Sequence, residues 1–336
     1  MDICVCGAQV PFTWGGAELH MENLVAALGR HHRAELVRLP VAWERERLFE
    51  AALAWRLVPL DGDLVIATNF PSYYVRHRRK VVWLFHQHRG AYDCADTAWS
   101  DIGLDDHSLE AQRLLADWDV RALEEAERIF TTSRTVADRL ARFNGLRGEP
   151  LYHPPPLHDR LRPGPFGDYV LSASRLEHNK RPELLAEALA CSTSGPRGVL
   201  AGRGSLAGEL RARAEALGVA GRLEMPGHLS DDELVRRFSG ALAVLYAPFD
   251  EDYGYVTLQA FYAAKPVITA NDSGGVLEWV EDGETGLVTD GSPEATAAAI
   301  DKLAGDPALA RRLGEAGRAR VAEVSWDVVV ERLVGG

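Results

Sequence analysis

The chain has 336 residues, of which 46% are hydrophobic and 26% are charged, an ordinary balance for a soluble globular protein. This length predicts two domains rather than one. The formal net charge of −12 argues against nucleic acid as the main partner, because binding a phosphate backbone requires a basic surface.

The cysteines and the apolar segments bear on the cellular compartment. The cysteines form no CxxC pair, which favours a reducing cytoplasm over a disulfide framework. They are Cys4, Cys6, Cys94 and Cys191. The chain starts directly with a strand-like apolar stretch, so we expect no signal peptide, and no apolar run has the length of a membrane span. We predict a cytoplasmic protein, with peripheral contact at the inner face of the membrane left open.

Short apolar runs alternate with helical patterns in the first half of the chain. Residues 81–85 are apolar throughout, which is typical of a parallel strand buried on both faces. The predicted strands are Ile3–Cys6, Glu35–Leu39, Asp63–Ala67, Val81–Phe85 and Ile129–Thr132, and the clearest helices are Ala17–Leu28 and Leu109–Ala126. This alternation predicts a Rossmann-like domain over residues 1–155.

A proline-rich stretch then interrupts the alternation. Residues 152–167 contain five prolines and two glycines, which cannot continue a helix or a central strand. We interpret 156–167 as a linker and 168–323 as a second Rossmann-like domain. Its predicted strands are Tyr169–Ala173, Val199–Ala201, Leu223–Met225, Ala243–Tyr246, Val267–Thr269 and Leu287–Thr289, followed by helices Pro293–Ala304 and Leu309–Ala322. Residues 324–336 are predicted as a C-terminal helix, whose return to the N-terminal domain is left open.

The predicted fold class is therefore α/β, with two doubly wound domains that face each other across a cleft. Ligands of open α/β sheets bind beyond the carboxyl ends of the strands, so this cleft is the expected site. Residues that directly follow the predicted strands are the first candidates for binding and catalysis.

Two motifs follow strands in the N-terminal half. Gly15 and Gly16 begin the first long helix, where unpaired amides suit an anion, although a tight turn alone also explains the pair. The pattern is not GxGxxG, which disfavours a nicotinamide dehydrogenase. His86 follows the strand at 81–85. A hydrogen bond to a sugar or phosphate fits it better than a metal, because no third ligand accompanies the spacing of His86 and His88.

Two charged runs have ordinary explanations. Asp61–Asp63 resembles a metal-binding DxD motif. However, it precedes a strand, whereas the expected site lies at the carboxyl ends of the strands, so the segment is better explained as a turn. Val75–Lys80 is basic and could meet anionic lipid head groups, but such a run is more typical of the solvated C-terminal end of a helix. We predict no metal site.

Further motifs follow strands in the C-terminal half. Arg175 comes just after a strand and Lys180 just before a helix, so two cations and a helix N-terminus would form a clamp for a diphosphate. The chain has only four lysines beside 33 arginines, and this scarcity favours a functional reason for Lys180. At Gly202, Gly204 and Met225, a nucleotide contact and a simple turn are weighed about equally.

Taken in order, these segments resemble glycosyltransferase family 4, the retaining GT-B transferases. The matching segments are WGGAE, SRLEHNK, GRGS, PGHLSDDEL, DEDYGYVTLQAF, AAKPVITANDSGG and EDGETGLV. The resemblance covers nearly the whole chain and is strongest over residues 169–288. The family pattern contains an acid, an aromatic, a glycine and a second acid eight residues after the first. Gly254 fixes the register of the comparison. Glu251 then aligns with the first acid and Tyr253 with the aromatic residue. Gln259 stands where the family has the second acid, so the chain departs from the pattern there.

The resemblance implies roles for these positions. Glu251 would accept hydrogen bonds from donor-sugar hydroxyls, and Gln259 would hold the nucleotide ribose with a contact weaker by about 1 kcal/mol than that of a carboxylate. The amides of Gly254, Tyr255 and Val256 would meet the diphosphate. The other matches are Arg175 and Lys180 for the diphosphate-binding pair, Gly15 and Gly16 for the N-terminal glycine loop, and His86 for the sugar-side histidine.

The implied reaction is transfer of a sugar from a UDP- or GDP-linked donor to a hydroxyl of a glycan, a lipid-linked glycan or a small natural product, with retention of configuration. Arg175, Lys180 and helix N-termini would stabilise the leaving diphosphate, so neither metal nor cofactor would be required. No carboxylate nucleophile for a double displacement is evident. Candidate acceptor contacts are Trp14, Tyr92 and Trp99.

Two alternatives stay open. Gln259 motivates a catalytically weak binding protein or transferase subunit on the same fold. A sugar-nucleotide epimerase has a similar two-domain fold, but the motif around Glu251 favours the transferases. The oligomeric state is not indicated.

Overall fold

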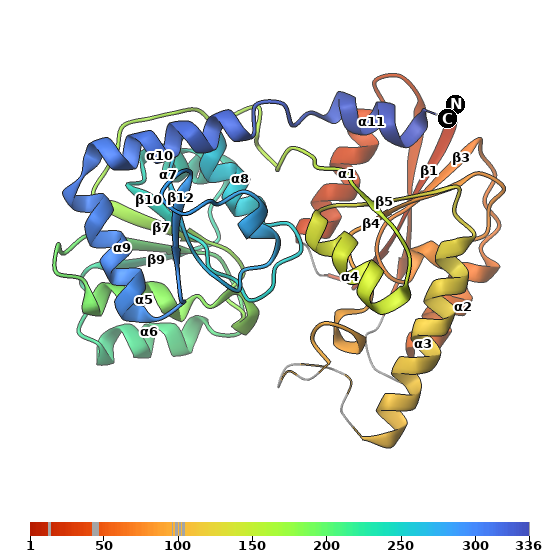
Figure 1. Cartoon of the computed structure of the whole chain (residues 1–336), viewed down its shortest axis with the longest axis horizontal. Coiled ribbons are helices and arrows are strands. Elements are labelled where there is room, and N and C mark those ends of the chain that lie inside the picture. The colour runs from red at the N-terminus through yellow and green to blue at the C-terminus, as the bar shows by residue number, and fades with distance from the viewer. Residues whose placement is uncertain are drawn as a thin grey trace. The chain divides into compact units, whose positions relative to one another are not determined.

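The computed structural model describes residues 1–12, 15–41, 47–95, 97, 100, 102 and 105–335. The chain divides into two compact units: unit 1 comprises Met1–His153 and Val324–Gly336, and unit 2 comprises Pro154–Glu323. Each unit contains a six-stranded sheet flanked by helices, and neighbouring strands run parallel (Figure 1). The predicted fold class, with two doubly wound α/β domains, is confirmed.

Unit 1 has the strand order β2-β1-β3-β4-β5-β6. Its strands are β1 (Asp2–Gln9), β2 (Arg33–Pro40), β3 (Leu64–Ala67), β4 (Lys80–Leu84), β5 (Arg128–Thr131) and β6 (Glu149–Pro150). Its helices are α1 (Gly16–Leu28), α2 (Leu48–Leu57), α3 (Asp106–Glu124), α4 (Arg134–Asn144) and α11 (Trp326–Val334). The last helix follows unit 2 in sequence and packs on α1, so the chain returns to unit 1.

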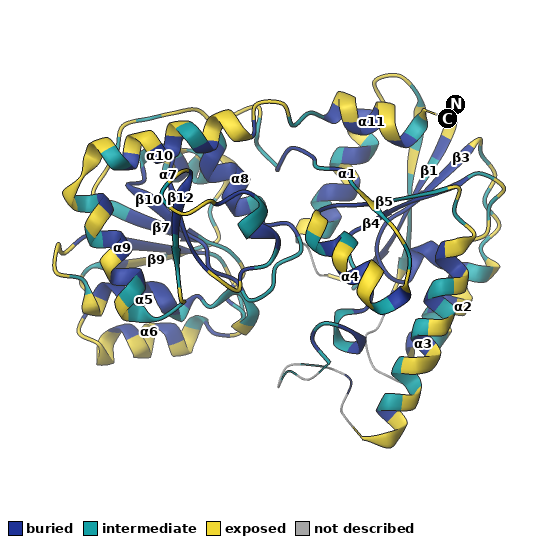
Figure 2. Ribbon diagram, in the orientation of Figure 1, coloured by how far each residue is buried: buried dark blue, intermediate teal, exposed yellow. Residues whose placement is uncertain are grey.

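Both faces of the unit 1 sheet are covered. Successive side chains of a strand point to opposite faces. Val81 and Trp83 pack in a core with α1 and α11, whereas Val82 and Leu84 pack in a second core with α2, α3 and α4. The central strand β3 and residues 81–84 of β4 are therefore apolar at every position, and these strands are buried where the outer helix faces are exposed (Figure 2).

The basic run at residues 75–80 differs from the expected helix end. It follows a single 3₁₀ turn, Ser72–Tyr74, and leads into β4. Lys80 is fully buried, and its Nζ donates to the carbonyls of Tyr73, Val75 and Ala122 at 3.1, 3.3 and 2.7 Å. Burial lowers the pKa of Lys80 to about 8. This lysine was expected to be solvated, but it satisfies buried carbonyl groups instead.

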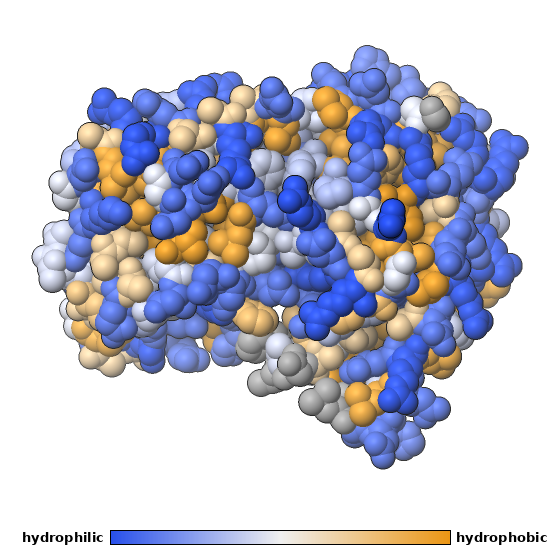
Figure 3. Space-filling model, viewed as in Figure 1, coloured by the Kyte–Doolittle hydropathy of each residue, from blue (hydrophilic) through white to orange (hydrophobic). Residues whose placement is uncertain are grey.

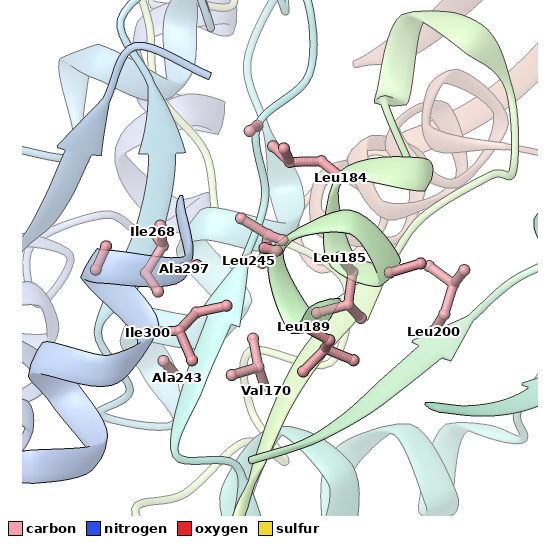
Figure 4. Close-up of a cluster of buried hydrophobic side chains, with 14 of the residues drawn as sticks. Val170, Leu184, Leu185, Leu189, Leu200, Ala243, Leu245, Ile268, Ala297 and Ile300 are labelled. Atoms are coloured by element: carbon pink, nitrogen blue, oxygen red, sulfur yellow. The ribbon is translucent and has the colours of Figure 1, made fainter. Parts of the chain in front are cut away.

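Unit 2 has the strand order β12-β11-β10-β7-β8-β9. Its strands are β7 (Tyr169–Ala173), β8 (Arg197–Ala201), β9 (Leu223–Gly227), β10 (Ala243–Leu245), β11 (Val267–Ala270) and β12 (Gly286–Thr289). Its helices are α5 (Glu183–Cys191), α6 (Ala207–Ala216), α7 (Asp231–Gly240), α8 (Tyr255–Tyr262), α9 (Pro293–Gly305) and α10 (Pro307–Arg320). Leucine, isoleucine and alanine side chains of α5 and α9 pack on one face of this sheet (Figure 4).

The surface agrees with the composition. The face drawn in Figure 3 is largely hydrophilic, with hydrophobic residues gathered in patches between hydrophilic ones. Within the described part of the chain, no helix has both the length and the apolar character needed to cross a bilayer.

Candidate functional site

The strand order of unit 2 creates a switch point at the carboxyl edge of its sheet. β7 and β10 are neighbours, but the chain goes on from β7 to β8 and β9 on one side, and from β10 to β11 and β12 on the other. Loops diverge at such a point and leave room for a ligand. Two of these loops, residues 174–182 and 246–254, carry Arg175, Lys180, Glu251 and Gly254 of the predicted site.

Lys180 and Glu251 form an ion pair between these loops. Lys180 ends the 3₁₀ turn His178–Lys180, and its Nζ donates to Oε2 of Glu251. The two side chains are 12% and 14% exposed, so the pair is largely enclosed but still reaches solvent. Tyr246 donates from Oη to the same oxygen at 2.8 Å. Burial and the neighbouring carboxylate raise the pKa of Tyr246 well above its usual range, so its hydroxyl stays protonated and donates.

Arg175 adds a second cation beside this group. Its side chain is exposed, and no described residue forms a hydrogen bond or ion pair with its guanidinium. Arg175 follows β7 and Tyr246 follows the neighbouring strand β10, so both lie at the same edge of the sheet. The guanidinium is therefore available to an anionic ligand at this edge of the sheet.

Gly254 caps the N-terminus of α8, three residues after Glu251. Its φ of 83° and ψ of 62° are left-handed, and a Cβ would lie 2.8 Å from Cγ2 of Val276. Glycine is required here for both reasons. The amides of Tyr255 and Val256 belong to the first helical turn, whose N–H groups have no partner within the helix. Such a helix start suits a phosphate.

Gln259 lies one helical turn further along α8. It is 7% exposed, and its Nε2 donates to the carbonyl of Pro156 at 3.2 Å. The side chain therefore ties α8 to the proline-rich segment, and a glutamate could not donate this hydrogen bond. Oε1 of Gln259 accepts no hydrogen bond from the residues that the structure describes. The departure from the family pattern thus has a structural role that the motif alone does not indicate.

Gly202 and Gly204 follow β8, and both have a packing reason. A Cβ at Gly202, where φ is 145°, would lie 1.8 Å from the carbonyl oxygen of Ser174, and one at Gly204 would lie 2.2 Å from that of Leu176. The loop after β8 can therefore lie directly against the loop that carries Arg175. Met225, in β9, is half-buried and packs against the apolar core of unit 2.

In unit 1, the predicted residues lie at the carboxyl edge of the other sheet. Gly15 caps α1, and its amide donates to Oε2 of Glu18 at 2.8 Å. The Gly15 amide, which was predicted to bind an anion, is therefore already hydrogen-bonded to the carboxylate of Glu18. His86 follows β4, is half-buried, and has its Nδ1 2.6 Å from the carbonyl oxygen of Gln87. Trp14 and Trp99 lie outside the described residues.

A buried polar network next to His86 was not expected from the sequence. Asp119 of α3 is fully buried and accepts from Oη of Tyr92 at 2.6 Å. Asn144 of α4 donates to the same hydroxyl at 3.3 Å and accepts from Gln87 at 2.8 Å. Burial raises the pKa of Asp119 to about 6, and the hydroxyl donors limit that rise. The predicted acceptor contact Tyr92 is thus mainly a buried hydrogen-bonding residue.

The residues considered for metal binding have structural surroundings. His88 is buried, and burial lowers its pKa to about 4. Asp61–Asp63 precedes β3, and Oδ2 of Asp63 accepts from the amide of Asp2 at 2.9 Å. Among the described residues, no three His, Cys, Asp or Glu side chains are grouped closely enough to hold an ion.

A cavity of about 1230 Å³ lies elsewhere on unit 2. Its walls come from residues 158–166, from the end of α8, and from α10 with the two residues that follow it, and they include none of the predicted site residues. This cavity is therefore separate from the predicted site, which is defined by charge and by strand ends.

Comparison with known proteins supports this description. Residues 164–320 match the family model described as Glycosyl transferases group 1. The D-inositol 3-phosphate glycosyltransferase of Acidothermus cellulolyticus is 30% identical over 254 residues, which cover 67% of this chain and 55% of that protein. The human alpha-1,3/1,6-mannosyltransferase ALG2 is 39% identical over 94 residues, which cover 28% of this chain and 22% of that protein. The chain therefore spans about half, or less, of these relatives' lengths.

Solved structures match nearly the whole chain. Sucrose-phosphate synthase from Thermosynechococcus elongatus has a TM-score of 0.80 at 19% identity, covering 99% of this chain and 97% of that one. HepE of Anabaena, solved in complex with UDP and glucose, has a TM-score of 0.74 at 16% identity, covering 98% and 97%. The expectation of a glycosyl-transfer enzyme agrees with the family match and with the names of the relatives. The chain therefore has the GT-B fold, and its unit 2 carries the segment that matches the group 1 glycosyl transferases.

Proposed function

We propose that the protein is a retaining glycosyltransferase that moves a sugar from a nucleoside-diphosphate sugar to an acceptor hydroxyl. The observation that carries this proposal is the group of Lys180, Glu251 and Tyr246 at the switch point of unit 2, beside the N-terminus of α8. An ammonium group and a helix start suit a diphosphate, and a carboxylate beside them suits sugar hydroxyls. The family match over residues 164–320 supports this assignment.

In the proposed donor complex, the diphosphate meets Arg175, Lys180 and the amides of Tyr255 and Val256. A phosphate that takes hydrogen bonds from Lys180 competes with Glu251 for the ammonium group. Donor binding would thus open the ion pair and leave the carboxylate to accept hydrogen bonds from the sugar.

The nucleoside is proposed to follow the diphosphate along the same edge. Oε1 of Gln259 accepts from a ribose hydroxyl, which leaves its Nε2 on Pro156. Gly202, which directly follows β8, and Met225, in the neighbouring strand β9, are proposed to border the base. From unit 1, His86 and the turn at Gly15 and Gly16 are proposed to contact the sugar and phosphate, as the family resemblance implies.

The proposed reaction breaks the bond between the anomeric carbon and the diphosphate oxygen. Arg175, Lys180 and the start of α8 stabilise the negative charge that develops on the leaving diphosphate, and they do so without a metal ion. The acceptor hydroxyl attacks from the face that the diphosphate leaves, and a leaving phosphate oxygen takes its proton. This same-face course gives retention, and we adopt it by analogy with the resembling family.

The identities of donor and acceptor are also proposals. A UDP-linked donor comes first, because the neighbour HepE was solved with UDP and with UDP-glucose, and a GDP-linked donor is the alternative. The acceptor is proposed to be a hydroxyl of a glycan, a lipid-linked glycan or a small natural product. A cytoplasmic location, with peripheral membrane contact left open, fits four cysteines that are all free thiols.

A second candidate is a binding subunit of the same fold that transfers sugar poorly. The observation that favours it is the hydrogen bond from Gln259 to Pro156, which commits this side chain to a structural contact.

A turnover assay tests the proposal. The full chain is incubated with UDP-glucose or GDP-mannose and a panel of acceptors, and release of UDP or GDP is followed with the anomeric configuration of the product. We expect acceptor-dependent release that falls at least about a hundredfold in Lys180→Ala and Glu251→Ala. Donor binding without release would favour the binding subunit, and a converted donor without acceptor would favour an epimerase. Binding of neither nucleotide sugar would overturn the assigned site.

A further inference from the structure

Arg181 and Asp272 form a paired contact next to the proposed donor site. Nη1 and Nη2 of Arg181 donate to the two carboxylate oxygens of Asp272 at 2.7 and 2.5 Å. The two residues are 91 positions apart in sequence, in the loops that follow β7 and β11. A two-pronged pair of this kind constrains orientation as well as distance.

The backbone of Arg181 has an unfavourable conformation. Its φ of 46° and ψ of 50° are left-handed, which residues with a side chain rarely adopt. Arg181 is the residue directly after Lys180, so this left-handed conformation lies next to the proposed diphosphate-binding lysine. Non-glycine residues that persist in this region are held by their surroundings, and such positions gather at functional sites.

Further contacts connect this pair to the loop that carries Glu251. The amide of Phe249 donates to the carbonyl of Asn179 at 2.8 Å, and the amide of Asp250 donates to the carbonyl of Asp272 at 2.9 Å. The Arg181 guanidinium also lies over the Phe249 ring, 5.4 Å from its centre. Three loops, those after β7, β10 and β11, therefore meet at one pair of side chains.

The loop after β11 also supports Glu251 through its backbone. The amide of Gly275 donates to the carbonyl of Glu251 at 2.7 Å, and a Cβ at Gly274 would lie 2.6 Å from that carbonyl oxygen. Asp272 thus belongs to a segment whose backbone packs directly against the backbone of the loop that carries Glu251. A shift of Asp272 would be passed on to Glu251.

We propose that the pair of Arg181 and Asp272 is a positioning device that holds Lys180 and Glu251 at the spacing required for donor binding. This inference rests on the proposed function, because it assigns Lys180 and Glu251 to the donor. Neither Arg181 nor Asp272 needs to touch the donor. The pair acts by joining the loop after β7, which carries Lys180, to the loops that carry and support Glu251.

A purely structural role is the competing explanation, and unit 2 contains a matched control for it. Arg197 donates to both carboxylate oxygens of Asp168 at 3.0 and 2.7 Å. This second pair lies at the amino ends of β8 and β7, at the opposite edge of the same sheet. Its loss removes the same kind of contact from the same unit without touching the loops of the proposed site.

The test measures binding of UDP, and of GDP in parallel, by calorimetry on the full chain, together with the melting temperature of each variant. We expect Arg181→Ala and Asp272→Ala to bind the better nucleotide about tenfold more weakly than the wild type. We expect Arg197→Ala to bind it within about twofold of wild type. The exchanged pair, Arg181→Asp with Asp272→Arg, should recover part of the lost affinity, because aspartate tolerates the left-handed backbone better than most residues.

The variant Arg181→Gly distinguishes the effect of losing the guanidinium from the effect of backbone strain. Glycine adopts the left-handed conformation without strain, so this variant should melt higher than Arg181→Ala and still bind the nucleotide about tenfold more weakly than wild type. Wild-type affinity in Arg181→Gly would overturn the inference. So would affinities that follow the melting temperature in all variants, Arg197→Ala included. A wild-type chain that binds neither nucleotide would overturn the donor site itself, and that failure is visible before any substitution is made.

Discussion

Tyr246 supports both the acid and the glycine of the motif that follows β10. Its Oη donates to Oε2 of Glu251 at 2.8 Å, and its ring lies under Gly254, where a Cβ would be 3.4 Å from Cε1 of Tyr246. The tyrosine is 5% exposed, so its ring is held by packing. One buried side chain therefore sets the position of the proposed sugar-binding carboxylate relative to the start of α8.

Tyr246→Phe should weaken binding of UDP-glucose more than binding of UDP. The substitution keeps the ring but removes a hydrogen bond to a charged group, worth about 1.5–3 kcal/mol, so the carboxylate proposed to bind the sugar loses its orientation. We expect at least about a tenfold loss for UDP-glucose by calorimetry, and a smaller loss for UDP. Tyr262→Phe is the control, because the Tyr262 hydroxyl donates to the carbonyl of Val321 at 3.5 Å and Tyr262 ends α8, at the opposite end of the helix from Gly254. Equal losses for both ligands would contradict the assignment of Glu251 to the sugar.

Gln259→Glu should change stability and donor binding in opposite directions. A carboxylate cannot donate to the Pro156 carbonyl, so the free energy of unfolding should fall by about 1–3 kcal/mol. The same charge would strengthen the proposed ribose contact by about 1 kcal/mol, a roughly fivefold gain in affinity for UDP. Melting temperature and calorimetry measure the two effects. Gln259→Met, which removes both hydrogen-bonding groups, should lower stability without any gain in affinity. Weaker UDP binding in Gln259→Glu would argue against a ribose contact at this position.

Much of the fold could be predicted because buried parallel strands have a strong pattern. The predicted strand Tyr169–Ala173 has the bounds of β7, and the other strands differ from the prediction by a few residues at their ends. β6 was missed, because its two residues, Glu149 and Pro150, are too few to show any periodicity. Lys80 was misjudged for a different reason. A lysine in a basic run looks solvated, and its carbonyl partners come from segments that the pattern does not connect to it.

The candidate site could be predicted only where a residue directly follows a strand. Lys180 and Glu251 meet because their strands, β7 and β10, are neighbours in the sheet. Tyr246 also follows β10, and a tyrosine at the end of an otherwise apolar strand was a signal that could have been used. Arg181 and Asp272 carried no such signal, because their contact depends on how three loops pack together.

Lys80→Met should destabilise unit 1. The substitution keeps most of the apolar stem but leaves three buried carbonyl groups without their donor, so we expect the free energy of unfolding to fall by about 3 kcal/mol or more. Urea unfolding measures the loss. Lys302→Met is the control, because Lys302 is exposed on α9 and should tolerate the change within about 0.5 kcal/mol. A stability loss in Lys302→Met as large as that in Lys80→Met would show that burial is not the cause.

His20 and His153 form a buried pair that should make stability depend on pH. Nδ1 of His20 lies 2.7 Å from Nε2 of His153, and the rings of Trp83 and Trp326 pack against both histidines. Burial lowers the pKa of each histidine well below its usual range, so both rings are neutral in the folded chain near pH 7. Protonation would place a charge inside a cluster of buried aromatic rings, and burial disfavours the charged form of the imidazole.

Because the folded pair resists protonation, acid should favour the unfolded chain. Unfolded histidines titrate near pH 6.5, so below about that pH the unfolded state binds protons that the folded pair does not. The free energy of unfolding should fall as pH is lowered from about 7.5 to about 6, by at most ~1.4 kcal/mol per pH unit for each histidine. Asp119, whose pKa is raised to about 6, has the opposite effect at lower pH, but it is present in every variant compared. Urea unfolding across this range should show a shallower pH dependence in His153→Gln than in wild type, whereas His31→Gln, at an exposed position, should keep the wild-type slope. An unchanged slope in His153→Gln would assign the pH dependence to other groups.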